Sequence, residues 1–488
     1  MMMMMFCQTG KMIGVFLTLL GWNGLSPVPY MAYLIGTTEP ALRLLISILL
    51  GYPLGFFYNH YIKNKYPSYR NLFFIITGLD IAIYNFGWSL YHNLIPGIVI
   101  YLSTKLLGPT KLNAIFTLIF NMTYLLAGYI TTESEDYDIT WTMPQCVLTL
   151  KLIALSFDLW DGQNIKEEPL PLDGYQQLPL KSSPSLEELI GFIYFPACFL
   201  VGPIFSYRRY LDFIGDKFPV SAEHEVIKRA ALKRLMLGLG YLFAFQVGTY
   251  VFSMKYMLSD EFWETSIIYR HVYCGMWAHF ALYKYISCWL LTEASCIRFG
   301  LSYNGIVKTG KNEAVSKWDG CNNIKLMRFE CATKFQHYID SFNCNTNNFA
   351  AKYIYKRLKF LGNRNLSQLF TLLFLALWHG TRSGYYMTFF NEFLIIYMEK
   401  DIENILSKTE IYHTLWNSKA KYVMYALLKV YTIVFMGWSL GPFDLKVYTK
   451  WFPLYASLYF SGFIIFLPWG FAYKPLVVKL IKKYTQPQ

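Results

Sequence analysis

One histidine at the end of an apolar run is the side chain best placed to do chemistry. His379 follows the run from Leu372 to Trp378 and precedes Gly380. An ionisable side chain at such a depth in a membrane costs about 3 kcal/mol or more, so it is a functional candidate by default. Its position alone leaves two interpretations open. The imidazole takes part in a reaction, or it donates a hydrogen bond to a carbonyl of a neighbouring helix.

A second polar group that could serve the same reaction is Asn343, in the segment 341–347. It precedes His379 by 36 positions, about 54 Å along one straight helix, so the two meet only if the chain turns back. The sequence at 361–363, Leu-Gly-Asn, permits such a turn. Burial keeps an imidazole neutral, and a neutral imidazole beside a carboxamide supplies a general base and a fixed hydrogen-bond donor. That pair suffices for acyl transfer from an activated thioester to a hydroxyl.

A covalent route is a second form of this chemistry, because Cys344 adjoins Asn343. Cysteine thiolates activated by histidine are common nucleophiles. However, Cys344 lies in an Asn-rich stretch with no evident second group to orient the base, and an activated thioester needs no covalent step. We therefore expect direct transfer.

Two other motif matches lack the structural context that their chemistry requires. Residues 437–441 match a G-x-S-x-G nucleophile elbow, which needs a strand, a turn and a helix, whereas this motif closes an apolar run. Residues 305–311 match most of a phosphate-binding loop, but Asn312 replaces its Ser or Thr. The nine cysteines form no C-x-x-C pair, so we expect no metal.

A second histidine, His279, also lies in an apolar run. Lys284 follows it, and Glu293 stands further along the chain. We expect these three polar groups to form a hydrogen-bonded set within the membrane, since isolated polar groups are costly there.

The composition indicates which elements position these residues. The chain has 488 residues, of which 55% are hydrophobic and only 15% charged, and its mean hydropathy is +0.29. Such values are typical of polytopic membrane proteins. The short apolar stretch from Met12 to Leu20 is interpreted as an uncleaved first or half segment.

About eleven transmembrane helices are predicted, in an all-α fold that makes residues 1–488 a single membrane-embedded domain. The segment 366–399 is interpreted as two helices. The predicted spans are 41–58, 71–90, 93–108, 111–130, 142–159, 186–205, 230–253, 266–291, 366–399, 421–440 and 453–472.

Positive charge is concentrated in one polar interval. The net charge is +13, and residues 300–365 hold eleven Lys and Arg against four Asp and Glu. An excess of Lys and Arg in loops marks the cytosolic side of a membrane protein. Nucleic-acid binding also requires basic residues, but we expect no nucleic-acid partner for a chain that lies mostly in lipid.

The end of that interval, residues 349–361, has the pattern of an amphipathic helix. Apolar residues from Ala350 to Leu361 recur at helical spacing, and Lys352, Lys356 and Lys359 fall on another face. A basic amphipathic helix lies in the membrane interface. Two roles are open for its lysines: an anchor to anionic lipid, or attraction and binding of a polyanionic substrate.

Several motifs, taken together, resemble one enzyme family. The stretch from Asn343 to Gly380 is similar to the membrane-bound O-acyltransferase (MBOAT) family, and most closely to its lysophosphatidylcholine acyltransferase branch, which remodels phospholipids. The other motifs that carry the resemblance are 39–45, 137–144, 199–203, Trp318-Asp319 with Asn323, 353–362 and 382–385.

The resemblance implies a many-helix fold around a tunnel in which acyl-CoA meets a lysophospholipid. It assigns His379 as the essential histidine and Asn343 as its asparagine. Six further motif positions are implied to be structural or to line the substrate tunnel: Trp378, Gly380, Trp318, Asn323, Gly202 and Pro203. Thr381-Arg382 departs from the family pattern of Leu-His, which affects substrate detail near the site.

The activity implied is transfer of a fatty acyl group from acyl-CoA to the free hydroxyl, expected at sn-2, of lysophosphatidylcholine and related lipids. Acyl-CoA is then a co-substrate, and no cofactor is expected. By analogy, the protein is a multi-pass protein of the endoplasmic reticulum membrane, and a homo-oligomer is left open. Two alternatives remain: another acyl acceptor within the family, such as a sterol or a secreted protein, or a polytopic transporter. The sterol-enzyme motif F-Y-x-D-W-W-N is absent, and no inverted repeat is evident.

Overall fold

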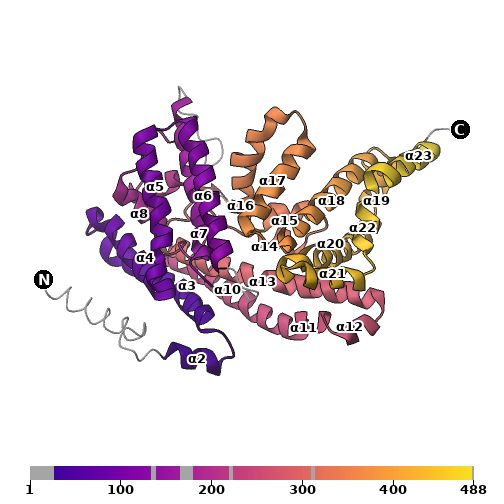
Figure 1. Ribbon diagram of the computed structural model, residues 1–488, viewed down its shortest axis with the longest axis horizontal. Coiled ribbons are helices and arrows are strands. Elements are labelled where there is room, and N and C mark those ends of the chain that lie inside the picture. The colour runs from indigo at the N-terminus through magenta and orange to yellow at the C-terminus, as the bar shows by residue number, and fades with distance from the viewer. Residues whose placement is uncertain (1–26, 133–138, 165–179, 219–223, 309–313, 486–488) are drawn as a thin grey trace. The chain divides into compact units, whose positions relative to one another are not determined.

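The computed structural model describes residues 27–132, 139–164, 180–218, 224–308 and 314–485 (Figure 1). Helices dominate these residues, which confirms the predicted all-α membrane fold. The chain divides into two compact units. Unit 1 comprises Met1–Arg234 and Leu291–Cys321, and unit 2 comprises Leu235–Leu290 and Asn322–Gln488. Two long helices, α10 (His224–Val251) and α13 (Ile267–Phe299), pass from one unit into the other.

Unit 1 holds the helices before α10 and a short β-hairpin. Its strands β1 (Ile306–Lys308) and β2 (Ala314–Ser316) pair antiparallel, with Val307 opposite Val315. Its helices are α2 (Val28–Leu34), α3 (Glu39–Phe57), η1 (Tyr58–Ile62), η2 (Pro67–Tyr69), α4 (Arg70–Phe86), η3 (Gly87–Leu90), α5 (Tyr91–Leu107), α6 (Lys111–Thr132), α7 (Thr142–Asn164), α8 (Leu186–Ile193) and α9 (Tyr207–Ile214).

The predicted span 186–205 is wrong as a continuous helix. Its helix α8 ends at Ile193, and the chain then runs through turns that are almost entirely buried in the core of unit 1. Pro196 and Pro203 account for the break, because proline lacks an N–H and disfavours a helical residue before it. Gly202 adds a close approach, since a Cβ there would lie 2.3 Å from the Cα of Cys198.

Unit 2 contains the rest of the helices. They are α11 (Met254–Met257), α12 (Asp260–Glu264), α14 (Leu326–Glu330), α15 (Phe335–Ser341), α16 (Cys344–Phe349), η4 (Ala350–Ile354), η5 (Tyr355–Leu361), α17 (Arg364–His379), α18 (Ser383–Leu406), α19 (Glu410–Asn417), α20 (Ala420–Leu445), α21 (Tyr448–Ser457), α22 (Ser461–Phe466), η6 (Trp469–Tyr473) and α23 (Lys474–Thr485).

The predicted reversal at residues 361–363 is present in unit 2. Gly362 ends η5 in the left-handed conformation, with φ 65°, which glycine adopts without steric cost. Asn363 then caps α17, because its side-chain oxygen accepts hydrogen bonds from the N–H groups of Asn365 (2.9 Å) and Leu366 (3.2 Å). As a result α17 packs back against η4 and η5, and also against α18.

The predicted division of 366–399 into two helices is also confirmed, with the boundary at Gly380. This residue has φ 137°, a backbone angle that residues with a Cβ rarely adopt. Its N–H donates to the carbonyls of Ala376 and Leu377, both at 3.2 Å. The chain therefore leaves α17 immediately after His379 and starts α18 at Ser383.

Seven helical stretches among the described residues are long and apolar enough to cross a membrane. They are 39–62, 67–107, 111–132, 142–163, 224–257, 420–445 and 461–481. The predicted number of about eleven is thus not confirmed. The predicted segment from Met12 to Leu20 lies outside the described residues, and the prediction of a single domain stays a prediction.

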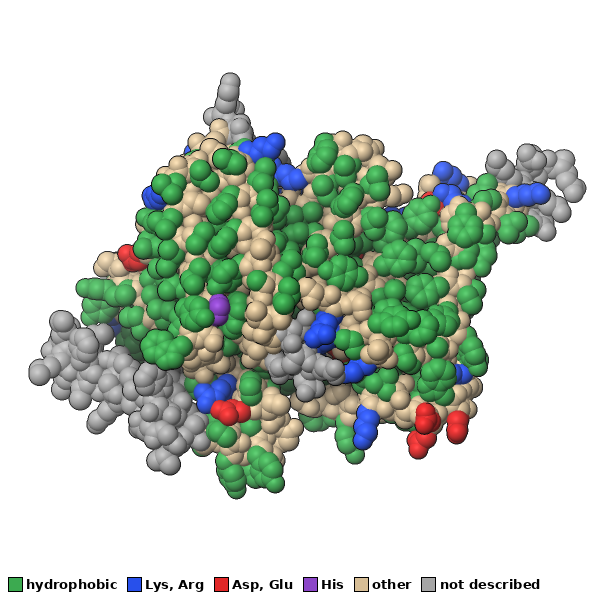
Figure 2. Space-filling model, viewed as in Figure 1, with side chains coloured by type: hydrophobic (Ala, Val, Ile, Leu, Met, Phe, Trp, Pro, Cys, Tyr) green, Lys and Arg blue, Asp and Glu red, His purple; other side chains and the backbone are tan. Residues whose placement is uncertain are grey.

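Large apolar side chains are exposed on the outer helices, as a lipid environment requires. On α6, Leu112, Ile119 and Ile130 are each more than three-fifths exposed. In the face shown in Figure 2, hydrophobic side chains cover much of the surface, and charged side chains are few. This distribution supports a multi-pass membrane protein.

A glycine in α4 tests the packing of unit 1. A Cβ at Gly78 would lie 1.8 Å from the carbonyl oxygen of Tyr194, whereas one at Gly240 in α10 would meet no atom within 4 Å. We expect Gly78→Ala to lower the free energy of unfolding by roughly 1–3 kcal/mol, and Gly240→Ala to raise it by about 0.5–1 kcal/mol. Thermal unfolding of the purified variants measures both, and equal stabilities would contradict the close α4 packing.

Candidate active site

Asn343 lies in a strained turn between α15 and α16. Its backbone is left-handed, with φ 49° and ψ 44°, a conformation that asparagine tolerates better than most residues. The turn is held by an antiparallel bridge between Ile324 and Phe342 and by a 2.8 Å hydrogen bond from the N–H of Lys325 to the carbonyl of Ser341. The backbone geometry therefore fixes the direction in which Asn343 projects.

The carboxamide of Asn343 is held by a second asparagine. Asn323 donates from Nδ2 to Oδ1 of Asn343 at 3.0 Å, and its own Oδ1 accepts from the N–H of Asn345 at 2.9 Å. The carbonyl of Asn323 also accepts from the N–H of Cys344, at 3.0 Å. Asn323 is thus a positioning residue, and it leaves the NH₂ of Asn343 as the group available to donate.

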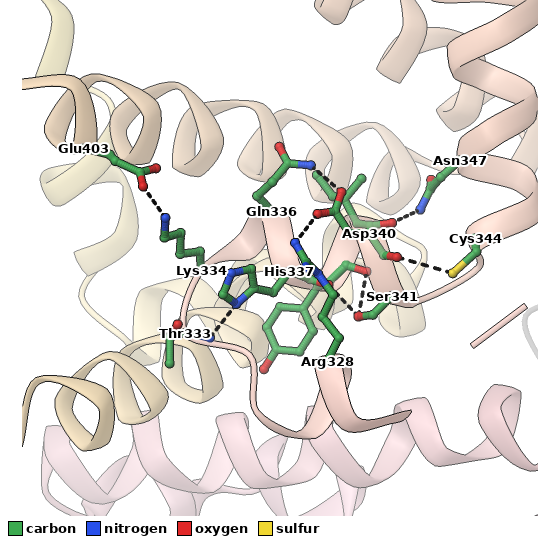
Figure 3. A network of polar contacts seen from close by, with 12 residues as sticks. Arg328, Thr333, Lys334, Gln336, His337, Asp340, Ser341, Cys344, Asn347 and Glu403 are labelled. Atoms are coloured by element: carbon green, nitrogen blue, oxygen red, sulfur yellow. Dashed lines mark hydrogen bonds and ion pairs between the residues drawn. The ribbon is translucent and has the colours of Figure 1, made fainter. Parts of the chain in front are cut away.

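The other polar residues of this segment build the support for α15 and its turn (Figure 3). Asn347 donates from Nδ2 to the carbonyls of Ile339 (2.7 Å) and Phe342 (2.9 Å). Asp340 accepts from Arg328 (2.5 Å) and from Gln336 (2.9 Å). The asparagine-rich sequence is therefore largely a scaffold, in which the side-chain NH₂ groups of Asn343 and Asn345 stay available.

Cys344 points back into the scaffold. Its side chain is 7% exposed, and its Sγ donates to the carbonyl of Asp340 at 3.5 Å. It is not among the residues that line the cavity described below. This placement favours the expectation of direct transfer.

His379 is surrounded by aromatic rings. Its ring centroid lies 5.5 Å from that of Phe389, in a stacked arrangement, and 4.9 Å from that of Phe443, edge to face. The buried Trp378 (4.6 Å) and Tyr385 (5.8 Å) complete this surround. Among the described residues, none forms a hydrogen bond with either ring nitrogen. The interpretation of His379 as a donor to a neighbouring carbonyl is therefore wrong.

His379 and Asn343 line the same cavity, whose volume is about 180 Å³. Its lining residues come from α13 to α18 and from α20, and all of them lie in unit 2. They consist mainly of aromatic and aliphatic side chains. The polar residues of the lining are Asn343, Thr346, Asn347, His379, Thr388, Glu392 and Ser439. The turn at 361–363 thus brings the two predicted catalytic residues to one place, and their roles stay predictions.

Three of the other predicted site residues are basic and lie away from the cavity lining. Lys352 contacts Tyr353, with its Nζ 2.9 Å from the hydroxyl and above the ring, and Lys356 and Lys359 are exposed. The predicted amphipathic helix is irregular, with a π-helical part (η4) and a 3₁₀ part (η5). A regular helical face is therefore only approximate, although Ala350 and Ile354 are buried as predicted.

Trp318 belongs to unit 1, outside the unit that holds the cavity. It packs edge-on against Tyr303, with 5.5 Å between ring centroids. Trp378 and Gly380 border His379 instead, one by packing on its ring and the other by ending its helix. Whether any of these residues contacts substrate stays a prediction.

The predicted partners of His279 are wrong. Its Nε2 lies 3.3 Å from Oε2 of Glu330, and Glu330 also accepts from the hydroxyls of Tyr241 (2.9 Å) and Tyr283 (3.0 Å). Glu293 instead pairs with Arg234, at 2.5 Å. A partner about fifty residues away in the sequence cannot be found from spacing along one helix.

The G-x-S-x-G match at 437–441 lies within helix α20, so it is no nucleophile elbow. Its glycines allow close packing of helices. A Cβ at Gly437 would lie 2.4 Å from the carbonyl carbon of Cys274, and one at Gly441 would lie 2.8 Å from Leu454. Ser439 is buried between them and reaches the cavity wall.

Sequence reasoning missed two polar residues of α18 that line the cavity, Thr388 and Glu392. Glu392 has the same signal that identified His379, because it is an ionisable residue inside an apolar stretch, Phe389-Phe390-Asn391-Glu392-Phe393-Leu394. Within the described part of the chain, no group of three or more His, Cys, Asp or Glu is arranged to hold a metal.

Comparison with known proteins agrees with the predicted family. A sequence model of the membrane-bound O-acyltransferase (MBOAT) family matches residues 126–440. Lysophospholipid acyltransferase 5 of Mus musculus is 42% identical over 451 residues, 91% of each chain. Its namesake in Drosophila melanogaster is 41% identical over 445 residues, 90% of this chain and 88% of the relative. The lysophospholipid acyltransferase of Schizosaccharomyces pombe is 30% identical over 388 residues, which are 74% of this chain and 72% of the relative. The chain therefore belongs to the membrane-bound O-acyltransferase family and is a multi-pass membrane acyltransferase.

Proposed function

We propose that this protein transfers a fatty acyl group from acyl-CoA to the free sn-2 hydroxyl of a lysophospholipid. The acceptors are lysophosphatidylcholine and related lipids. The observation that carries the proposal is the shared cavity of His379 and Asn343, an imidazole with open nitrogens and a carboxamide held by Asn323. The names of the relatives, matched over about nine-tenths of this chain, support a lysophospholipid as the acceptor.

In this mechanism His379 is the general base. Its imidazole removes the proton of the acceptor hydroxyl while that oxygen attacks the thioester carbonyl, and the carbonyl π electrons move onto oxygen. The tetrahedral intermediate collapses when the oxyanion electrons re-form the carbonyl and the C–S bond breaks, while the new C–O bond to the acceptor is kept. The departing thiolate of CoA then takes the proton from the imidazolium. No oxidant, reductant, metal or cofactor is needed.

Asn343 would stabilise the negative charge on the carbonyl oxygen. Its Nδ2 is directed by the hydrogen bond that Asn323 makes to Oδ1, so little reorganisation accompanies the reaction. The aromatic surround of His379 excludes water, which favours transfer to the acceptor over hydrolysis of the thioester.

The basic interval 300–365 would face the cytosol and recruit the phosphate-bearing end of acyl-CoA. Lys356 and Lys359 are exposed and outside the cavity lining, which suits long-range attraction rather than chemistry. The proposal also places the protein in the endoplasmic reticulum membrane, where lysophospholipid remodelling is expected, and leaves homo-oligomerisation open.

The first prediction concerns His379. We expect His379→Ala to lower the rate of acyl transfer by roughly 10²–10⁴-fold, because the general base is lost, with a thermal unfolding temperature close to wild type. Purified protein with labelled acyl-CoA and lysophosphatidylcholine measures this. His279→Ala is the matched control: it removes a partner of Glu330 and should reduce stability more than turnover. Substantial transfer by a well-folded His379→Ala protein would refute the mechanism.

The second prediction tests the clamp on Asn343. Asn323→Asp keeps an acceptor for the N–H of Asn345 but has no N–H to donate to Asn343. A loosened carboxamide should lower kcat by roughly 10- to 100-fold, while KM for acyl-CoA and the unfolding temperature stay near wild type. In Asn345→Ala the backbone N–H that binds Asn323 remains, so this variant should keep most of its kcat. Equal kcat for Asn323→Asp and wild type would remove Asn323 from the mechanism.

The third prediction concerns the three lysines of η4 and η5, of which Lys356 and Lys359 are exposed. Replacing Lys352, Lys356 and Lys359 by Gln should raise KM for acyl-CoA a few-fold and flatten its salt dependence, because surface attraction is screened over about 8 Å at physiological salt. The value of kcat should change little. The control is Lys228→Gln, an exposed lysine paired with Glu225. A collapsed kcat at constant KM would show that the lysines support the site's architecture.

A further inference from the structure

One face of α18 presents unused polar groups to the cavity. Tyr385, Thr388, Phe389 and Glu392 stand at helical spacing. Tyr385 and Phe389 contact the ring of His379, and the other two line the cavity with Phe389. Glu392 is therefore on the same wall as the aromatic surround of the proposed general base, although the mechanism above does not use it.

Glu392 has no partner among the residues that the structure describes. Its carboxyl group forms no hydrogen bond or ion pair with any residue that the structure describes, and no Lys or Arg is part of the cavity lining. The hydroxyl of Thr388, one turn earlier, is buried and also has no partner. A carboxylate between apolar walls is costly unless a cation or donors satisfy it. The missing partner is then supplied by the substrate.

The next carboxylate on α18 shows that the protein can satisfy such a group. Glu399 stands two turns after Glu392 and accepts hydrogen bonds from the N–H of Phe335, at 3.1 and 3.0 Å, and from the hydroxyl of Tyr431, at 3.1 Å. The contrast between the two glutamates is one of position, because Glu392 alone reaches the cavity.

The cavity that Glu392 lines has walls that suit a positively charged group. Tyr285, Trp289, Phe389 and Phe443 all line the cavity, and the faces of such rings attract ammonium groups, above all quaternary ones. A carboxylate combined with aromatic faces is thus a complete site for an organic cation. The same lining offers no positive side chain to a headgroup that is only anionic.

We propose that Glu392, together with these rings, binds the cationic nitrogen of the acceptor headgroup and so determines the preference for ammonium-bearing lysophospholipids. The inference rests on the proposed function, because it assumes that the acceptor enters the His379 cavity. Glu392 is then a specificity-determining residue. It acts on the binding of one class of acceptor and not on the transfer of the proton.

The experiment compares two acceptors with the same acyl chain, lysophosphatidylcholine and lysophosphatidylglycerol, which has no nitrogen. The ratio of their kcat/KM values is measured for the full-length wild type, Glu392→Gln and the control Glu399→Gln. Glu392→Gln keeps the shape but removes the charge, and should lower the ratio about tenfold, as expected for a lost contact with a desolvated cation. The change should come from KM for lysophosphatidylcholine. Glu399→Gln should leave the ratio unchanged.

Two results would overturn the proposal. An unchanged ratio in a folded Glu392→Gln protein would show that the headgroup nitrogen does not meet this residue. An equal loss for both acceptors would assign Glu392 to the chemical step or to the architecture of the site. If Glu392→Gln unfolds at a lower temperature, Glu392→Asp provides the test, because it keeps the charge and should keep the wild-type preference.

A binding measurement separates this inference from the proposed function. A phosphocholine ether lipid without a free hydroxyl cannot be acylated, and it should bind the wild type about tenfold more tightly than Glu392→Gln. Equal binding would refute the role of Glu392 even if acyl transfer is observed. Conversely, the wild type could bind the ether lipid about tenfold more tightly than Glu392→Gln and yet transfer no acyl group. That result would refute the proposed function alone.

Discussion

Polar groups surrounded by apolar side chains need hydrogen-bonding partners. In unit 2, the groups that have such partners hold the fold together, and several groups that lack them lie at the candidate site. Glu330 accepts from two tyrosines and lies beside His279. The side-chain NH₂ of Asn347 donates to two carbonyls. Each satisfied group fixes two segments that are distant in the sequence. Among the groups without a partner in the described residues, the ring nitrogens of His379, the carboxylate of Glu392 and the hydroxyl of Thr388 belong to residues that line the cavity. An unmet hydrogen-bonding requirement there is a cost in the free protein that substrate can relieve.

Backbone conformation decides where these open groups lie. Three positions with positive φ, Asn343, Gly362 and Gly380, change the chain direction beside the site. Gly362 returns α17 toward η4 and η5, and Gly380 ends α17 directly after His379. Asn343 differs from the two glycines because it combines the left-handed conformation with a functional side chain. The strain at this position is supported by the bridge between Ile324 and Phe342 and by Asn323.

Local sequence signals predicted the features that depend on local chemistry. The reversal at 361–363 follows from glycine and a capping asparagine, and His379 follows from an ionisable residue in an apolar run. The features that were missed depend on packing between distant segments. The hydrogen bond between Asn323 and Asn343 spans twenty positions. His279 lies beside Glu330, about fifty positions away, in addition to its contact with Tyr283 on its own helix. The prediction of a continuous helix at 186–205 was wrong because two prolines interrupt it, and these prolines are visible in the sequence. The number of spans was harder to predict, because buried apolar segments inside the protein have the same composition as segments that cross lipid.

The arrangement of charge separates two tasks that a transferase of this kind must combine. Its proposed donor is strongly anionic at the CoA end, and the exposed Lys356 and Lys359 stand outside the cavity lining. The lining itself contains one carboxylate and no Lys or Arg, so a polyanion gains nothing by entering it. The CoA phosphates would then stay at the exposed lysines while the thioester alone reaches His379. The acceptor headgroup, if it bears a cation, is drawn to the opposite kind of surface. Separation of the two substrates by charge would reserve the space around the imidazole for the two reacting groups. This separation depends on a few charged side chains placed in and near a predominantly aromatic cavity.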